Sequence, residues 1–346
     1  MKKKYLFILS LIVCYYANQI TFAQVTLVRD INPGSYNSQP MYMTNVNGIV
    51  YFYAQNGIYG SSGDGGELYR SNGTSGGTYL VKDINAGTTG STINALTNVN
   101  EVAFFSASTS ATGQELFKSN GTRGGTVLVK DINPGSSNGM ENVNTRPVFI
   151  SFKNKLYFQA TNGTNGMELW SSDGTSGGTE MVLDINPGSG NSLKYPFFTI
   201  CNDSLFFIAD DGGGVGQLWK TDGTTSGTKK ASTMFINNNY AGTTLGIASP
   251  DLYAFNNVLY IDAGNKLLTY DESGNGAVIL HDFFPGGRIA TDAYFCNNGS
   301  EVFFAAYTDA TGQELWKTNG TDIGTVMVKD IPSRFFLFQP KRSDQL

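Results

Sequence analysis

The chain has 346 residues, enough for one large domain or two ordinary ones. Charged residues make up only 15% of it and aromatic residues 13%, a combination that excludes an intrinsically disordered protein. The formal net charge of −5 gives no support for a nucleic-acid partner. The 42 glycines, with many Asn, Ser and Thr residues beside Tyr, Phe and Val, predict short strands joined by tight turns.

Residues 1–23 have the composition of a secretory signal peptide. Three lysines follow Met1, residues 5–16 are mostly apolar, and small residues precede a predicted cleavage site after Ala23. We therefore expect the chain to be secreted, to reach the extracellular space or the cell surface, or to stay in the periplasm if no further export follows. The apolar run is too short to span a bilayer, and no second candidate span follows it.

A twelve-residue motif recurs along the chain, and its third copy reads ELWSSDGTSGGT from Glu168. The other copies are ELYRSNGTSGGT from Glu67, ELFKSNGTRGGT from Glu115, QLWKTDGTTSGT from Gln217, the worn KLLTYDESGNGA from Lys266, and ELWKTNGTDIGT from Glu314. Their starts are separated by 48, 53, 49, 49 and 48 residues. A period near fifty predicts a repeat architecture.

Each repeat is predicted to hold four short strands. In the third unit they cover residues 126–132, 148–152, 155–160 and 168–171, and the strand at 180–185 is the equivalent of the first, one unit on. Adjacent apolar residues such as Leu169 and Trp170 point to opposite faces of a sheet, so both faces must be covered. Stacked four-stranded sheets predict a β-propeller, with an open stack of β units as the alternative. The long link after each DINPG segment places the VKDI-type strand outermost.

We therefore predict an all-β protein, a propeller of about six four-stranded repeats of roughly 49 residues each, over residues 24–331. Successive blades are expected to end at Ile84, Ile132, Ile185, about Ile236, about Phe283 and Ile331. Residues 25–31 form an extra outer-type strand, so either the ring closes imperfectly or further blades are missing. The tail, residues 332–346, does not continue the repeat, which indicates a truncated or frame-shifted end.

Two positions of the motif are polar in nearly every copy. The turn position holds Asn or Asp interchangeably, which favours a turn-capping acceptor over a metal ligand; its residues are Asn72, Asn120, Asp173, Asp222 and Asn319. The first position holds a repeated glutamate: Glu67, Glu115, Glu168 and Glu314. Because it repeats, this glutamate is predicted to be structural, paired across strands with a lysine such as Lys82, Lys130 or Lys329.

The motif Glu168-Leu-Trp-x-x-Asp-Gly-Thr and its five partners resemble the ELWxxDGT repeat of secreted bacterial proteins. The LVKDINPG-type segments at 80–87, 128–135 and 183–188 add to the resemblance, which covers nearly all of residues 25–331. The resemblance implies a repetitive exported or surface protein.

Three places break the repeat and are candidates for chemistry. The only histidine, His281, stands where other copies carry Lys or Arg, so a strand substitution is favoured over a Ser-His-Asp site. Asp210 and Asp211 precede three glycines and could touch calcium, but a blade-edge turn is favoured and no cofactor is predicted. The irregular fifth unit, residues 230–277, holds the acids to test first, namely Asp251, Asp262, Asp271 and Glu272.

The cysteines are predicted to remain free. A lipoprotein site at Cys14 is disfavoured because the bulky Val13 precedes it. Cys201 and Cys296 align with large apolar residues of the other units, so both thiols are expected to be buried in the core. The aligned residues are Val46, Val99, Phe152 and Phe255.

The predicted function is a binding or adhesion module for extracellular polysaccharide or a surface protein, without catalysis. Loop Tyr, Asn and Asp residues would suit sugar hydroxyls. No catalytic, ligand-binding or metal residue is assigned, and the oligomeric state is left open. The alternatives are a glycoside hydrolase or lyase that uses two unrepeated carboxylates, and a passive structural coat protein.

Overall fold

Short strands and turns recur through the whole described chain. The computed structural model describes residues 25–57, 65–140, 149–193, 197–237, 252–272, 276–283, 285–289 and 294–331. The signal-peptide prediction, the tail, Cys14 and Asp251 fall outside these ranges. The described residues form strands, turns and irregular chain, and they include no helix that could cross a membrane.

The strands make six antiparallel sheets, each formed by strands that follow one another in the chain. The first sheet comprises β1 (Met41–Val46), β2 (Ile49–Asn56), β3 (Gly65–Ser71) and β4 (Tyr79–Lys82). The second comprises β5 (Asn94–Val99), β6 (Val102–Thr109), β7 (Gly113–Ser119) and β8 (Val127–Lys130). The third comprises β9 (Phe149–Phe152), β10 (Lys155–Ala160), β11 (Glu168–Ser172) and β12 (Thr179–Leu183).

The last three sheets follow the same plan. The fourth comprises β13 (Thr199–Cys201), β14 (Ser204–Ala209), β15 (Gly216–Thr221) and β16 (Lys229–Asn237). The fifth comprises β17 (Leu252–Phe255), β18 (Val258–Asp262), β19 (Lys266–Asp271) and β20 (Gly276–Asp282). The sixth has β21 (Gly287–Ile289) and β22 (Cys296–Asn297) beside β23 (Val302–Thr308), then β24 (Gly312–Thr318) and β25 (Val326–Lys329), so it is five-stranded.

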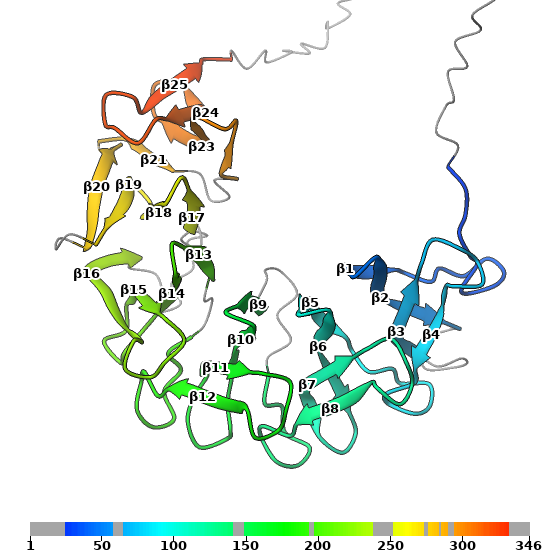
Figure 1. Ribbon diagram of the computed structural model, residues 1–346. Coiled ribbons are helices and arrows are strands. Elements are labelled where there is room, and N and C mark those ends of the chain that lie inside the picture. Colours follow the sequence, from blue (N-terminus) through cyan, green and yellow to red (C-terminus); the bar gives the residue numbers. More distant parts are fainter. Residues whose placement is uncertain are drawn as a thin grey trace, which may run out of the picture.

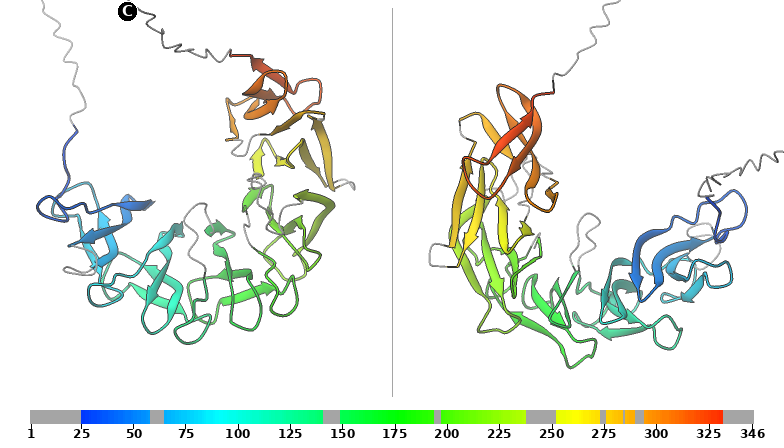
Figure 2. Two further views of the ribbon diagram at one scale, coloured as in Figure 1. Left: turned by 180° about the vertical axis from the view of Figure 1, so that it is seen from behind. Right: turned by 45° about the horizontal axis from the view of Figure 1, so that its top comes forward.

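The six sheets stand side by side along an arc (Figure 1). The first strand of each of the first five sheets lies on the concave side and the last strand on the convex side, which confirms that the VKDI-type strand is outermost. The arc is open, because the first and sixth sheets lie apart in every view (Figures 1 and 2). The six sheets confirm the prediction of an all-β repeat protein. None of the six sheets closes on itself.

Apolar side chains fill the space between neighbouring sheets. We call the face of a sheet that points to the next sheet its front face, and the opposite one its back face. Between the second and third sheets, Phe104 and Leu116 on the front face pack against Phe158 and Trp170 on the back face. The other four junctions are built in the same way. Each such side chain contributes about 1.5–3 kcal/mol of burial free energy. Because the front face of one sheet packs on the back face of the next, both faces of the inner sheets stabilise the stack, as predicted.

Tight turns join the first and second strands of most sheets at the inner rim. Lys153 and Asn154 both have positive φ, as a two-residue hairpin of this hand requires. Asparagines near these turns tie neighbouring sheets together. Asn98 Nδ2 donates to the Asn45 carbonyl over 3.3 Å, and Asn100 Nδ2 donates to the Asn154 carbonyl over 3.1 Å.

Two details of the predicted strands are wrong. Residues 25–31 are not a strand, because no neighbouring strand pairs with them; instead Ile31 packs on the back face of the first sheet and Arg29 donates to the Thr78 carbonyl. Four outer strands, β4, β8, β12 and β25, also end two residues earlier than predicted, whereas β16 and β20 end within one residue of the predicted place. β8 stops at Lys130 because the backbone N–H of Ile132 is taken by a side chain, described below.

Candidate functional site

The turn of the twelve-residue motif is held by its own side chains. Asp173 Oδ1 accepts hydrogen bonds from the backbone N–H and the hydroxyl of Thr175, over 2.8 and 2.7 Å. Thr175 Oγ1 in turn accepts from the Gly178 N–H over 2.9 Å. Ser172 and Thr179 close the base of the turn through their hydroxyls, 2.7 Å apart. These bonds also hold the pKa of the Asp173 carboxyl below its usual value.

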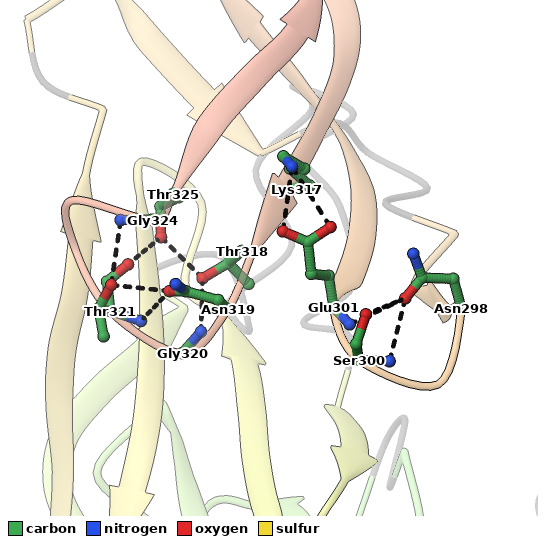
Figure 3. Close-up of polar contacts among 10 residues, drawn as sticks. All are labelled: Asn298, Ser300, Glu301, Lys317, Thr318, Asn319, Gly320, Thr321, Gly324 and Thr325. Atoms are coloured by element: carbon green, nitrogen blue, oxygen red, sulfur yellow. Dashed lines mark hydrogen bonds and ion pairs between the residues drawn. The ribbon is translucent and has the colours of Figure 1, made fainter.

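The sixth sheet repeats this turn with asparagine in place of aspartate (Figure 3). Asn319 Oδ1 accepts from the N–H and hydroxyl of Thr321, and Thr321 Oγ1 accepts from the Gly324 N–H. One acceptor oxygen is enough for both bonds, which is why Asn and Asp exchange freely. The prediction of a turn-capping residue is confirmed.

The glutamate that starts the motif is buried and accepts hydrogen bonds from backbone N–H groups, an arrangement that we call the glutamate lock. Glu168 is fully buried, and its Oε2 accepts from the N–H of Ile185 over 2.8 Å. Both of its oxygens also accept from Ser192, one from the hydroxyl and the other from the N–H. The side chain therefore ties β11 to the end of the outer strand β12 and to the connector that enters the next sheet.

The same lock recurs in the first two sheets. Glu115 accepts from the N–H groups of Ile132, Asn133 and Gly139 over 2.9, 3.2 and 2.9 Å. Glu67 Oε2 accepts from the Ile84 N–H over 2.9 Å and from the Ser91 hydroxyl over 2.7 Å. A repeated position that satisfies backbone donors in the same way each time has a structural role.

The predicted pairing of these glutamates with lysines is wrong. Lys82 Nζ donates to the Thr126 carbonyl, and Lys130 Nζ donates to the Thr179 carbonyl, each over 2.7 Å. Each lysine therefore reaches across to the turn of the next sheet instead of back to the glutamate of its own sheet. Arg29 makes the equivalent bond to the first sheet at Thr78.

Burial changes the protonation of the locking glutamates. Burial, as the largest cause, raises the pKa of Glu67, of Glu115 and of Glu168 to about 7 each. The backbone and serine hydrogen bonds oppose this rise, and a neighbouring aspartate adds to it. These aspartates, Asp83, Asp131 and Asp184, each have a buried Oδ1 without a hydrogen-bond partner.

The aspartates beside the lock were missed in the sequence. Each stands sixteen residues after its glutamate, at the same place in the DIN segment. This fixed spacing is the signal that could have linked the two carboxyl groups. A carboxyl with a raised pKa can serve as a general acid, but these groups are buried and bonded to backbone donors, which suits a structural lock.

His281 connects the fifth sheet to the sixth. Its Nδ1 lies 2.6 Å from Asp322 Oδ1 in the turn of the sixth sheet, and its ring lies against Phe283 at 4.7 Å between centroids. The contact crosses to the following sheet as the contacts of Lys82 and Lys130 do. The residue thus stands in the place of those lysines, in agreement with the predicted strand substitution.

The candidate calcium loop is a turn held by its own residues. Asp210 Oδ1 accepts from the N–H groups of Gly212 and Gly214 over 2.9 and 3.0 Å, and Asp211 forms an ion pair with Lys230. Within the described ranges, no group of three or more His, Cys, Asp or Glu side chains could hold a metal ion.

Among the described residues of the fifth unit, Asp262 lies at one end of the sheet and Asp271 and Glu272 lie at the other. Asp262 ends β18 and its Oδ1 accepts from the Gly264 N–H over 2.7 Å, whereas Asp271 ends β19 at the opposite end of the sheet. Glu272 forms an ion pair of 2.6 Å with Lys220 of the fourth sheet. Asp251 lies outside the described residues.

The two described cysteines are free, but they differ in burial. Cys201 is buried between the fourth and fifth sheets, as predicted. Cys296 is exposed, so the prediction of a buried thiol there is wrong. The cause is its place on the sixth sheet, whose front face has no following sheet among the described residues.

Comparison with known proteins gives structural neighbours only. No protein-family model matches the chain, and no curated protein matches it. A puromycin hydrolase matches over 84% of this chain and 54% of its own, with 12% identity and a TM-score of 0.40. A puromycin-hydrolyzing peptidase of Mycobacterium tuberculosis matches over 86% and 47%, with 9% identity and a TM-score of 0.45. A prolyl endopeptidase matches over 83% and 40%, with 12% identity and a TM-score of 0.43.

The predicted binding or adhesion module for extracellular polysaccharide or a surface protein is wrong by this comparison. The three matched structures are named as hydrolases or peptidases, and none as a glycan-binding module. The chain spans about half of those structures or less, and their activities are properties of those proteins.

Proposed function

We propose that this chain is an exported, non-catalytic structural scaffold of the ELWxxDGT-repeat kind. The observation that carries the proposal is the glutamate lock. In three sheets the same buried carboxyl closes the same junction between an outer strand and the next sheet. The repeated glutamates therefore act as structural groups that hold the junctions between neighbouring sheets, and the sheets together form a curved array.

The plan of this scaffold is that of a β-propeller left open. Each sheet is an antiparallel meander, and the chain passes from the outer strand of one sheet to the inner rim of the next, which is the propeller connection. X-ray scattering from residues 24–346 tests this directly. An open arc predicts a larger radius of gyration than a closed ring of the same length.

A hydrolysis assay tests the absence of catalysis. Residues 24–346 are incubated with fluorogenic aminoacyl and prolyl amides and with a fluorophosphonate probe for reactive serines. We expect no turnover and no labelling. Turnover that purifies with the folded chain and is lost on unfolding would overturn the proposal, and a His281→Gln variant would then show whether the His281–Asp322 pair carries it.

Export is tested separately. N-terminal sequencing of the protein recovered from outside the cytoplasm should begin at Gln24, directly after the predicted cleavage site. A chain that retains residues 1–23 and stays in the cytoplasm would contradict this part of the proposal.

A further inference from the structure

Each locking glutamate of the first three sheets stands opposite an aspartate. In the first sheet Leu68 of β3 pairs with Lys82 of β4, so Glu67 and Asp83 are the next residues along the two chains. The equivalent pairs in the second and third sheets are Glu115 with Asp131 and Glu168 with Asp184. Residues directly opposite each other in an antiparallel pair have Cβ atoms about 4.5–5.5 Å apart, and like charges at such places are destabilising. We call each of these three arrangements an acid pair.

Every acid pair contains a buried oxygen without a hydrogen bond. The three glutamates are fully buried. In each facing aspartate, Oδ1 is buried and makes no hydrogen bond with the described residues; these aspartates are Asp83, Asp131 and Asp184. An ionised carboxylate can only accept hydrogen bonds, whereas a protonated carboxyl has an O–H group to donate. A proton placed between the two carboxyl groups therefore supplies the missing bond.

The fourth and fifth sheets have no acid pair at the same place. In the fifth sheet Lys266 stands at the glutamate position and pairs with Asp282, and Lys266 Nζ lies 3.8 Å from Asp282 Oδ2. In the fourth sheet the position holds Gln217, which lies opposite Phe235. The aspartate of the fifth sheet thus faces a permanent hydrogen donor. In an acid pair such a donor can come only from a bound proton.

The lysines of the outer strands do not neutralise the acid pairs. Lys82 and Lys130 donate to carbonyl groups in the turn of the next sheet, and the third sheet has Leu183 at this position. Burial, as the largest cause, raises the pKa of each glutamate to about 7, and the facing aspartate adds to the rise. The folded chain therefore keeps protons on these pairs at a pH at which an exposed glutamate has lost its proton.

We propose that the glutamate and the aspartate of each acid pair share one bound proton, so that the lock is a proton site. When the pH rises, the proton passes to solvent and leaves two carboxylates facing each other in a buried place. Their repulsion then weakens the hold of the glutamate on the connector to the next sheet. The inference adds a proton-dependent device to the scaffold, and it does not depend on how the chain is exported or on whether it has a catalytic activity.

Exchange of the three aspartates for asparagine tests the shared proton. The triple variant Asp83→Asn, Asp131→Asn, Asp184→Asn keeps one oxygen of each side chain and offers an N–H donor in place of the proton. The measurement is the number of protons released when residues 24–346 are unfolded by urea at pH 6.5 in a weakly buffered solution. Groups outside the acid pairs contribute equally to both proteins.

The expected counts differ clearly. A glutamate with a pKa of about 7 is about three-quarters protonated at pH 6.5. The three acid pairs of the wild type should therefore release about two protons, because the unfolded glutamates are ionised at this pH. A facing amide N–H lowers the pKa of a carboxyl group, so the pairs of the triple variant should release at most about half as many.

Thermal melting gives a second readout. At pH 8 the wild-type pairs have lost most of their protons, so the triple variant should melt at a higher temperature than the wild type. At pH 5.5 the two proteins should melt alike. Asp282→Asn is the matched control, because it makes the same exchange at the equivalent place opposite Lys266. This variant should not melt above the wild type at either pH.

Three outcomes would overturn the proposal. Equal proton release from the wild type and the triple variant would show that burial alone keeps the glutamates protonated. A triple variant that melts below the wild type by the same amount at both pH values would show that the aspartates are only structural acceptors. A calcium-induced rise of the wild-type melting temperature at pH 8, absent from the triple variant, would show that the pairs hold a cation. Asp131→Asn alone, which should give about a third of each effect, decides the matter if the triple variant does not fold.

Discussion

Glu115 Oε2 accepts a 2.9 Å hydrogen bond from the backbone N–H of Ile132, seventeen residues later in the chain. That bond replaces the next rung of the β7–β8 ladder, so the outer strand stops at Lys130 and the chain turns toward the third sheet. A side chain thus sets the length of a strand and the direction of the connector. Equivalent bonds join Glu67 to Ile84 and Glu168 to Ile185.

Replacing this carboxylate by an amide should lower the unfolding free energy by different amounts in the first and second sheets. Both oxygens of Glu115 accept from N–H groups, so in Glu115→Gln the amide NH2 must face a donor. In Glu67, Oε1 makes no hydrogen bond of normal geometry among the described residues, and the Asn85 backbone N–H has only the smallest effect on the pKa of this carboxyl, so Glu67→Gln can place its NH2 there at less cost. At pH 8, where the wild-type carboxyl groups are ionised, we expect Glu115→Gln to lose about 1–3 kcal/mol of unfolding free energy and Glu67→Gln distinctly less.

Urea unfolding followed by circular dichroism measures both variants against the wild type. The two substitutions exchange a carboxyl oxygen for an amide nitrogen at equivalent positions, so each serves as the control for the other. Equal losses would show that the backbone donors around Glu115 do not determine the cost. In that case the lock would have to be explained by packing alone.

The stability of the fold should fall as pH rises from about 5 to about 8. Burial raises the pKa of each locking glutamate from 4.5 to about 7, so the folded chain keeps protons that the unfolded chain releases. The stabilisation is complete below the unfolded value and is lost as pH rises through the folded one, with a slope of at most about 1.4 kcal/mol per pH unit for each group. Asp173 and Asp222 have lowered pKa values and act in the opposite sense, but only near or below 3.8.

Urea midpoints between pH 5 and pH 8 check this sign. The wild type should be more stable at pH 5.5 than at pH 8, and Glu168→Gln should flatten part of the slope because it removes one titrating group. A midpoint that rises steadily over this range would mean that the glutamates are ionised in the folded state.

Adjacent glycines in the motif should differ sharply in tolerance. A Cβ on Gly178 would run into the Asp173 carboxyl group, whereas a Cβ on Gly177 would meet nothing within 4 Å. Gly178→Ala should therefore cost about 1–3 kcal/mol, while Gly177→Ala should be neutral or slightly stabilising. The melting temperatures of the two variants, each compared with that of the wild type, test this difference. Similar melting temperatures would show that the turn can relax around the added methyl group.

The copies of the motif agree with this expectation, because they keep the second glycine more strictly than the first. The second glycine is kept in the five well-formed copies, as Gly77, Gly125, Gly178, Gly227 and Gly324. The first is replaced by Ser226 in the fourth and by Ile323 in the sixth. The structure supplies the reason, since the close approach to the capping Asn or Asp recurs at each second glycine.

The strands and their order could be predicted from sequence because they follow from local patterns. The strands of the third repeat lie within a few residues of their predicted bounds, since short apolar runs and the turn residues that flank them determine these strands. The partner of the repeated glutamate could not be predicted in this way. Repetition shows that Glu115 and Glu168 share an environment, but not whether that environment is a lysine or a backbone amide.

The exposure of side chains on the sixth sheet also could not be predicted from local sequence. Cys201 and Cys296 occupy equivalent positions with similar neighbours in sequence, yet one is buried and the other exposed. The difference comes from the next sheet, which is present for Cys201 and absent for Cys296 among the described residues. The contact of His281 with Asp322 likewise depends on how two sheets are placed.

The capping aspartate of the third sheet should be replaceable by asparagine but not by alanine. Both bonds from Thr175 end on Asp173 Oδ1, and Asn120 receives the same two bonds from Thr122 in the second sheet. Asp173→Asn should therefore change the unfolding free energy by less than about 0.5 kcal/mol at pH 7, while Asp173→Ala should lose about 1 kcal/mol. Melts with calcium and with a chelator complete the test. A calcium-dependent melting temperature that Asp173→Asn abolishes would show that this aspartate binds a metal, and the turn-capping role would then be insufficient to explain it.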